Sequence, residues 1–128
     1  MARLALAGVV GGILLVAAGC GGQTTYTPAK TESCLTQRGA RIGGKLDFVA
    51  ETATGGAFVT QLGDNYATIA FGKTLADGKQ IELAYERFAF PNVRADLPDV
   101  LRRYDNAVTL WHAHPSSSDL SLVVGCLK

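Results

Sequence analysis

The sequence has few of the side chains from which catalytic and metal sites are usually built. Its 128 residues include two histidines, three cysteines, one tryptophan and one methionine. It also lacks a G-x-S-x-G nucleophile elbow, a G-x-G-x-x-G fingerprint and a phosphate-binding loop. Without these common hydrolase and nucleotide-binding patterns, we expect a protein that is not an enzyme and holds no cofactor.

An excess of charge of one sign is also missing. Lys and Arg number 12 and Asp and Glu 11, and the densest basic cluster, Arg102-Arg103, is flanked by aspartates. Nucleic-acid binding needs a basic face, and a polybasic membrane patch needs clustered lysines and arginines. We therefore expect no nucleic-acid partner.

One long apolar run does occur, over residues 4–18, and Arg3 precedes it as the positive end of a signal peptide. As a helix this run would span about 22 Å, which is short of the roughly 30 Å hydrocarbon core of a bilayer. The pattern therefore indicates a secretory signal peptide rather than a spanning helix. The alternative is an uncleaved N-terminal anchor in a tilted or thinned bilayer.

The run ends at Ala17-Ala18-Gly19-Cys20, which resembles the lipobox of bacterial lipoproteins. In that class a diacylglycerol is attached to the cysteine thiol, the signal peptide is cut before it, and the new amine is often acylated, for example with palmitate. Residue 17 is Ala where Leu is usual, and the same small residues fit an ordinary signal peptidase site that would leave Cys20 free. The resemblance implies lipidation of Cys20 and membrane attachment through the lipid.

The whole chain resembles the small lipoproteins of GC-rich Gram-positive bacteria. This resemblance rests on the AAGC lipobox, the T-x-x-C-L segment at 31–35 and the W-x-x-x-P…C-L ending. It implies a lipid-anchored protein on the extracytoplasmic face of the cell membrane, and no particular activity. We expect residues 1–19 to form the signal peptide, 20–30 the lipidated cysteine and a flexible tether, and 31–128 a single domain.

Three cysteines are an odd number, and lipidation of Cys20 leaves a pair. In an oxidising compartment Cys34 and Cys126 are then expected to form a disulfide. Closing so long a loop contributes about 4 kcal/mol in the chain-entropy model. The alternative is two buried free thiols.

The first half of the domain predicts a helix and three strands. Thr31–Gly39 has a capping threonine and a terminating glycine, which indicates a short helix. Residues 46–51 alternate between apolar and acidic side chains, as a half-buried strand does. Two β-rich runs, 57–62 and 66–71, flank Gly63-Asp64-Asn65, which predicts a β-hairpin.

The second half predicts more helix. Residues 81–88 carry apolar side chains at helical spacing, and Pro91 ends the pattern. Residues 96–104 indicate a brief helix with Asp96 as its cap, and 107–112 indicate a strand. Residues 116–127 fit either a helix or a strand, and their Ser-rich, acidic start favours the helix.

Together these elements predict an α+β fold. We expect a single antiparallel sheet of about four strands with helices packed on one face. The disulfide would join the N-terminal helix to the C-terminal helix.

His112 and His114 are candidate metal ligands because residues two apart in a strand point to the same side. A closed zinc site needs four ligands and a catalytic one usually three, so we assign no metal site and keep the two residues only as candidates. Aromatic side chains fit either the core or a ligand pocket, and the core is the commoner place for them. These are Phe71, Tyr85, Phe88 and Trp111.

The sequence therefore predicts a non-enzymatic binding or interaction role in the cell envelope. Its partner would be an envelope protein or a small ligand, in addition to the membrane that holds the lipid. The alternative is a small-ligand or metal-binding module that uses His112 and His114.

Overall fold

The computed structural model describes residues 25–128. The predicted signal peptide and the lipidation of Cys20 lie outside these residues. Within them, no helix is both long enough and apolar enough to cross a membrane.

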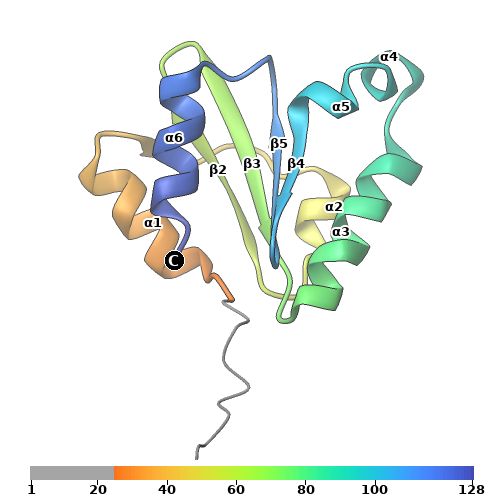
Figure 1. Ribbon diagram of the computed structural model, residues 1–128, viewed down its shortest axis with the longest axis horizontal. Coiled ribbons are helices and arrows are strands. Elements are labelled where there is room, and N and C mark those ends of the chain that lie inside the picture. The colour runs from red at the N-terminus through yellow and green to blue at the C-terminus, as the bar shows by residue number, and fades with distance from the viewer. Residues whose placement is uncertain (1–24) are drawn as a thin grey trace, which may run out of the picture.

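One antiparallel sheet of five strands forms the centre of the domain (Figure 1). Its strand order is β1-β2-β3-β5-β4, and every neighbouring pair is antiparallel. The strands are β1 (Arg41–Ile42), β2 (Ala57–Leu62), β3 (Asn65–Phe71), β4 (Leu101–Tyr104) and β5 (Ala107–Trp111).

The β2–β3 hairpin confirms the clearest sequence prediction. Leu62 pairs with Asn65, so the turn consists of Gly63 and Asp64 alone, and the predicted third turn residue begins β3. Gly63 has a φ of 60°, a conformation that glycine adopts without steric cost. The turn therefore follows from the position of this glycine between two β-rich runs.

Helices cover both faces of the sheet, so the predicted one-sided packing is wrong (Figure 1). On one face lie α1 (Pro28–Gln37) and α6 (Ser117–Cys126), and on the other lie α2 (Phe48–Glu51) and α3 (Leu75–Phe88). Two single-turn helices, α4 (Pro91–Arg94) and α5 (Leu97–Val100), follow α3 and lead into β4.

Two apolar clusters account for this arrangement. Ile69 and Phe71 of β3 belong to the cluster with α1 and α6, whereas Ala70 belongs to the cluster with α2 and α3. Side chains alternate between the faces of a strand, and a central strand covered on both faces is apolar on both. Every residue from 67 to 71 is buried, although Thr68 is slightly exposed. Helices on one face of the sheet could not bury the side chains on both faces of this strand, so the prediction of a single covered face was wrong.

Two sequence predictions of secondary structure are wrong. Residues 46–51 contain helix α2 instead of a strand, because the Asp47 side chain accepts a hydrogen bond from the Ala50 amide at 2.8 Å and caps the turn. The brief helix expected over 96–104 stops at Val100. Residues 101–104 form β4 because they pair with β5, with Leu101 opposite Leu110.

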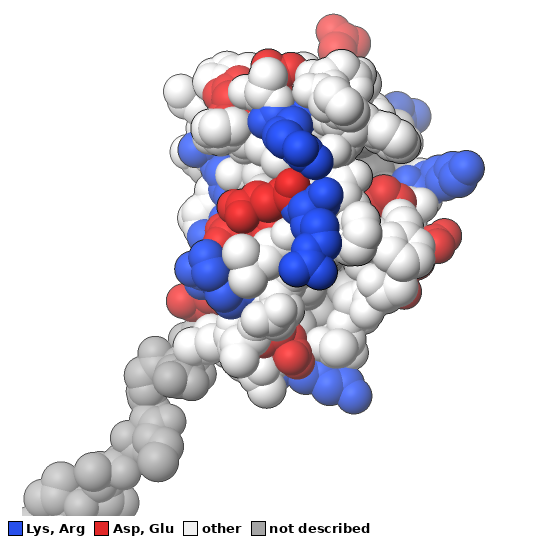
Figure 2. Space-filling model, turned by 90° about the vertical axis from the view of Figure 1, so that its right-hand side faces the viewer, with Lys and Arg blue, Asp and Glu red and all other residues white. Residues whose placement is uncertain are grey.

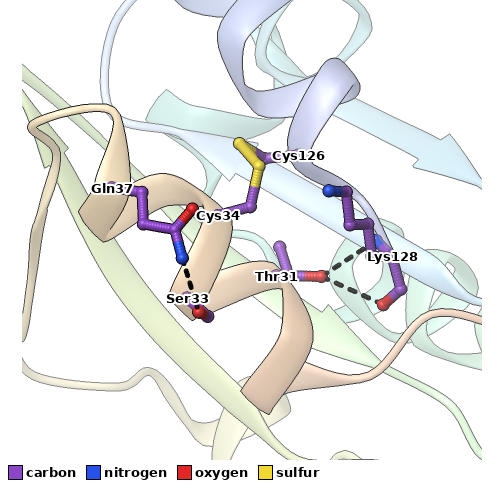
Figure 3. The surroundings of a disulfide bond; sticks show 6 residues. All are labelled: Thr31, Ser33, Cys34, Gln37, Cys126 and Lys128. Atoms are coloured by element: carbon purple, nitrogen blue, oxygen red, sulfur yellow. Dashed lines mark hydrogen bonds between the residues drawn. A yellow bond between two sulfur atoms is a disulfide. The ribbon is translucent and has the colours of Figure 1, made fainter.

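The disulfide between Cys34 and Cys126 is confirmed, and it joins α1 to α6 as expected (Figure 3). The two Cα atoms lie 5.3 Å apart. Beside it, the buried Thr31 hydroxyl donates to the Lys128 carbonyl and accepts from the Lys128 amide, at 3.3 and 3.2 Å. The C-terminal residue is thus fixed to the first helix, and the helical alternative for residues 116–127 is correct.

The first described residues are also held by the domain. The buried Asn106 side chain accepts from the Tyr26 amide at 2.7 Å and donates to the Tyr26 carbonyl at 2.8 Å. Helix α1 begins at Pro28, inside the segment predicted as a tether. Both apolar clusters, the sheet and the disulfide lie within residues 25–128, so this part of the chain contains the contacts that a domain needs to fold on its own.

Candidate functional site

An apolar cleft of about 270 Å³ opens on the α2–α3 side of the domain. It lies where α3 ends and the chain turns through Ala89 and Phe90 into α4. Its walls come from the start of α2, the end of α3, this turn, the short helices α4 and α5, and strand β5. The side chains that line it are Asp47, Phe48, Val49, Tyr85, Phe88, Ala89, Phe90, Val93, Leu97 and Leu110.

Three phenylalanines at this cleft are exposed to solvent. Phe48 is 66% exposed, Phe88 58% and Phe90 75%. The rings of Phe48 and Phe88 meet edge to face with their centroids 6.1 Å apart. Single exposed apolar side chains are normal, but several grouped around one hollow mark a binding surface.

A polar pair, the buried Tyr85 and the half-buried Asp47, lies at the base of the cleft. The Tyr85 hydroxyl donates to Asp47 Oδ2 at 2.9 Å, while Asp47 Oδ1 accepts the Ala50 amide. Burial raises the pKa of the Tyr85 phenol, and the neighbouring Asp47 carboxylate raises it further. Tyr85 therefore remains a hydrogen-bond donor across the neutral range, and both Asp47 oxygens already have a partner.

A second hollow of about 250 Å³ continues the cleft across the sheet. It shares Asp47, Val93 and Leu110 with the first, and its other end carries Lys45 and His112. The His112 ring stacks on Tyr66 with the ring centroids 4.4 Å apart. The combined cleft thus has an apolar, aromatic end and a polar end.

The two histidines have different partners. His114 Nδ1 lies 2.5 Å from Asp99 Oδ1 at the surface, whereas His112 contacts Tyr66. Among residues 25–128, no three His, Cys, Asp or Glu side chains are grouped in a way that could hold a metal ion. The structure places only His112 beside the cleft.

The sequence identified only some of the cleft residues. Of the four aromatic candidates, Tyr85 and Phe88 line the apolar end of the cleft. Phe71 and Trp111 are buried in the cluster beneath α1 and α6, and Trp111 also contributes to the wall of the second hollow. Asp47 and Phe48 were missed because their segment was predicted to be a strand, and Phe90 because it follows the end of the helical repeat. A usable signal is Phe90-Pro91, since a residue before proline is driven into an extended conformation that leaves the helix.

The surface beside α3 carries no field of one sign. Figure 2 shows acidic and basic side chains intermingled on this side of the domain. Glu82 contacts Lys79 at 2.7 Å and Arg103 at 3.5 Å. Burial alone would raise the pKa of Glu82, but these two cations outweigh it and lower the pKa. The cleft is therefore distinguished from its surroundings by apolar surface, not by charge.

No protein-family model, curated protein or solved structure matches this chain.

Proposed function

We propose that this protein is a lipid-anchored envelope lipoprotein without enzymatic activity, and that its domain binds the apolar part of a small amphipathic ligand in the cleft beside α3. The observation that carries the binding proposal is the group of three exposed phenylalanines around one apolar hollow. The lipobox-like residues 17–20 support the anchor.

Covering the exposed phenylalanines of the cleft with an apolar ligand is energetically favourable. Burying an exposed phenylalanine side chain fully contributes about 1.5–3 kcal/mol. The three exposed rings therefore supply several kcal/mol to an apolar ligand that covers them, and this gain offsets part of the cost of association. We expect affinities in the micromolar range, which corresponds to about −8 kcal/mol.

The cleft lies at the end of α3 that is farther from the tether, so a ligand would enter it at a distance from the membrane anchor. Tyr26 is bonded to Asn106 in the β4–β5 turn, and Gly78 of α3 packs against that turn so closely that a Cβ there would lie 2.5 Å from the Asp105 carbonyl oxygen. Phe88 follows Gly78 by ten residues, or about 15 Å of helix. The tether therefore joins the domain near one end of α3, and the cleft lies at the other.

Binding is tested with a chain from Gly21 to Lys128, exported by a cleavable signal peptide and titrated with a neutral, environment-sensitive apolar dye. We expect binding that Phe88→Ala weakens about tenfold, which is the loss of about 1.4 kcal/mol. Leu83→Ala is the matched control, because Leu83 is 41% exposed on α3 outside the cleft. Equal binding by the two variants would refute the cleft.

The anchor is tested in cells. We expect globomycin to make the signal-bearing form accumulate, and Cys20→Ala to release the protein from membranes or leave it unprocessed. A Cys20→Ala protein that is still processed and membrane-bound would disprove lipidation of Cys20.

A further inference from the structure

We infer that the ligand is an amphipathic anion with a single apolar chain, whose acidic head binds beside Lys45 and His112. This inference rests on the proposed function, because it names the chemistry of the ligand that the cleft would take.

The size of the apolar end favours one chain. Its volume of about 270 Å³ is slightly below the range of ordinary ligand pockets, which begins at about 300 Å³. Phe48, Phe88 and Phe90 surround it, and Val93 and Leu110 continue the apolar lining into the second hollow. An extended chain that starts at the phenylalanines would therefore reach the polar end of the cleft.

The polar end offers unused donors. Lys45 is exposed, and its ammonium group makes no hydrogen bond or ion pair with any of residues 25–128. His112 is also exposed, and within the same range its ring stacks on Tyr66 without a side-chain hydrogen bond. An acidic head placed here would gain a charge-assisted hydrogen bond from Lys45 without displacing an existing contact.

The single carboxylate of the cleft does not offer the same to a cation. Asp47 Oδ1 accepts the Ala50 amide and Asp47 Oδ2 accepts the Tyr85 hydroxyl. A cationic head would have to share these oxygens with the cap of α2 and with a buried phenol. The pattern of used acceptors and unused donors therefore favours an anion.

The experiment compares three probes with the same twelve-carbon chain: dodecanoate, dodecyltrimethylammonium and dodecyl maltoside, each below its micelle concentration. Calorimetric titration of the chain from Gly21 to Lys128 is expected to rank dodecanoate first. We expect Lys45→Ala to weaken dodecanoate about three- to tenfold and to leave the maltoside unchanged. Lys73→Ala is the charge-matched control, since Lys73 is exposed and lies outside the cleft.

The outcomes separate the two proposals. Equal binding of the three probes, with loss on Phe88→Ala, would overturn the acidic head and leave the apolar site intact. Tighter binding of dodecyltrimethylammonium would also overturn the acidic head and would indicate a cationic head bound at Asp47. Binding of none of the probes would overturn the proposed function and the inference together. Since Lys45 is exposed and unpaired within residues 25–128, its variants are expected to fold, and circular dichroism checks that they do.

Discussion

The two faces of the sheet are covered in different ways. The face beneath α1 and α6 is closed by two ten-residue helices that are joined by a disulfide, and it buries Phe71 and Trp111 almost completely. The opposite face is covered by α3 and by α2, a helix of four residues. Beyond the end of α3 only the single-turn helices α4 and α5 follow, and the cleft lies between them, α2 and Leu110 of the sheet.

This difference separates stability from binding. The closed face contains most of the large buried side chains. The disulfide between Cys34 and Cys126 joins the two helices that cover it, and these are the first and last helices of the domain. The open face has a smaller buried cluster and carries the exposed phenylalanines. We therefore expect substitutions on the first face to reduce the free energy of unfolding, and substitutions at the cleft to reduce binding.

The largest effect on the free energy of unfolding is expected when a phenylalanine is removed from each face in turn. Phe71→Ala removes a completely buried ring from the closed face and should cost about 3–5 kcal/mol of the free energy of unfolding. Phe88→Ala removes a ring that is 58% exposed and should change it by about 0.5 kcal/mol or less. Urea denaturation measures both, and comparable losses would contradict the division between the faces.

The disulfide is expected to have the next largest effect. Replacing both Cys34 and Cys126 by serine should cost about 2–4 kcal/mol, because the unfolded chain regains the entropy of a long loop. Dye binding by the protein that remains folded should be unchanged, since no residue of α1 or α6 lines the cleft. Ser33→Ala, on the same helix, serves as the control.

Mass analysis of the non-reduced wild type should show one disulfide bond between Cys34 and Cys126, and two alkylatable thiols would contradict it.

A smaller effect is expected at the base of the cleft. Tyr85→Phe removes the hydrogen bond to Asp47 and should cost about 1–2 kcal/mol at neutral pH. Because the pKa of Tyr85 is raised above its ordinary value of 10.0, its contribution is complete below about pH 10 and is lost as the pH rises further. Unfolding free energies measured from pH 7 to 11 should therefore fall less steeply above pH 10 in the variant. Parallel curves would mean that Tyr85 does not control the alkaline loss.

The smallest effect is expected from metal ions. His112 and His114 have separate partners, so Zn²⁺, Cu²⁺ or Ni²⁺ should shift the melting temperature of the wild type and of the double alanine variant equally. A shift that disappears in the double variant would restore the metal-binding alternative.

The sequence predicted the elements whose signals are local. The glycine of the β2–β3 turn, the helical spacing before Phe88 and the serine cap of α6 each act within a few residues, and all three elements are present. Strand β4 was taken for the continuation of a helix although its partner β5 follows after the two-residue turn Asp105-Asn106, because the cap at Asp96 gives no signal for where its helix ends. The second covered face was missed because the packing of helices on a sheet depends on contacts between distant segments.

The cleft was harder to predict than the core. Whether Phe48, Phe88 and Phe90 are buried depends on where helices end in space, and their identity as aromatic residues does not decide it. The disulfide, in contrast, followed from counting cysteines, because the residue reserved for the lipid left one pair.

The hydrogen bonds and the disulfide at the two ends of the domain also determine how it would bear mechanical load. Tension applied between the first described residues and Lys128 would first break the bonds of Tyr26 to Asn106 and of Thr27 to the Lys128 carbonyl. Once the first turns of α1 unwind, the segment from Tyr26 to Cys34 could reach an end-to-end length of at most about 29 Å. At Cys34 the force would pass through the disulfide to Cys126, the last residue of α6, and from there to Lys128. All five strands lie between the two cysteines in the sequence, so they would carry no tension. A pull on this domain would therefore extend the segment before Cys34 and leave the sheet intact.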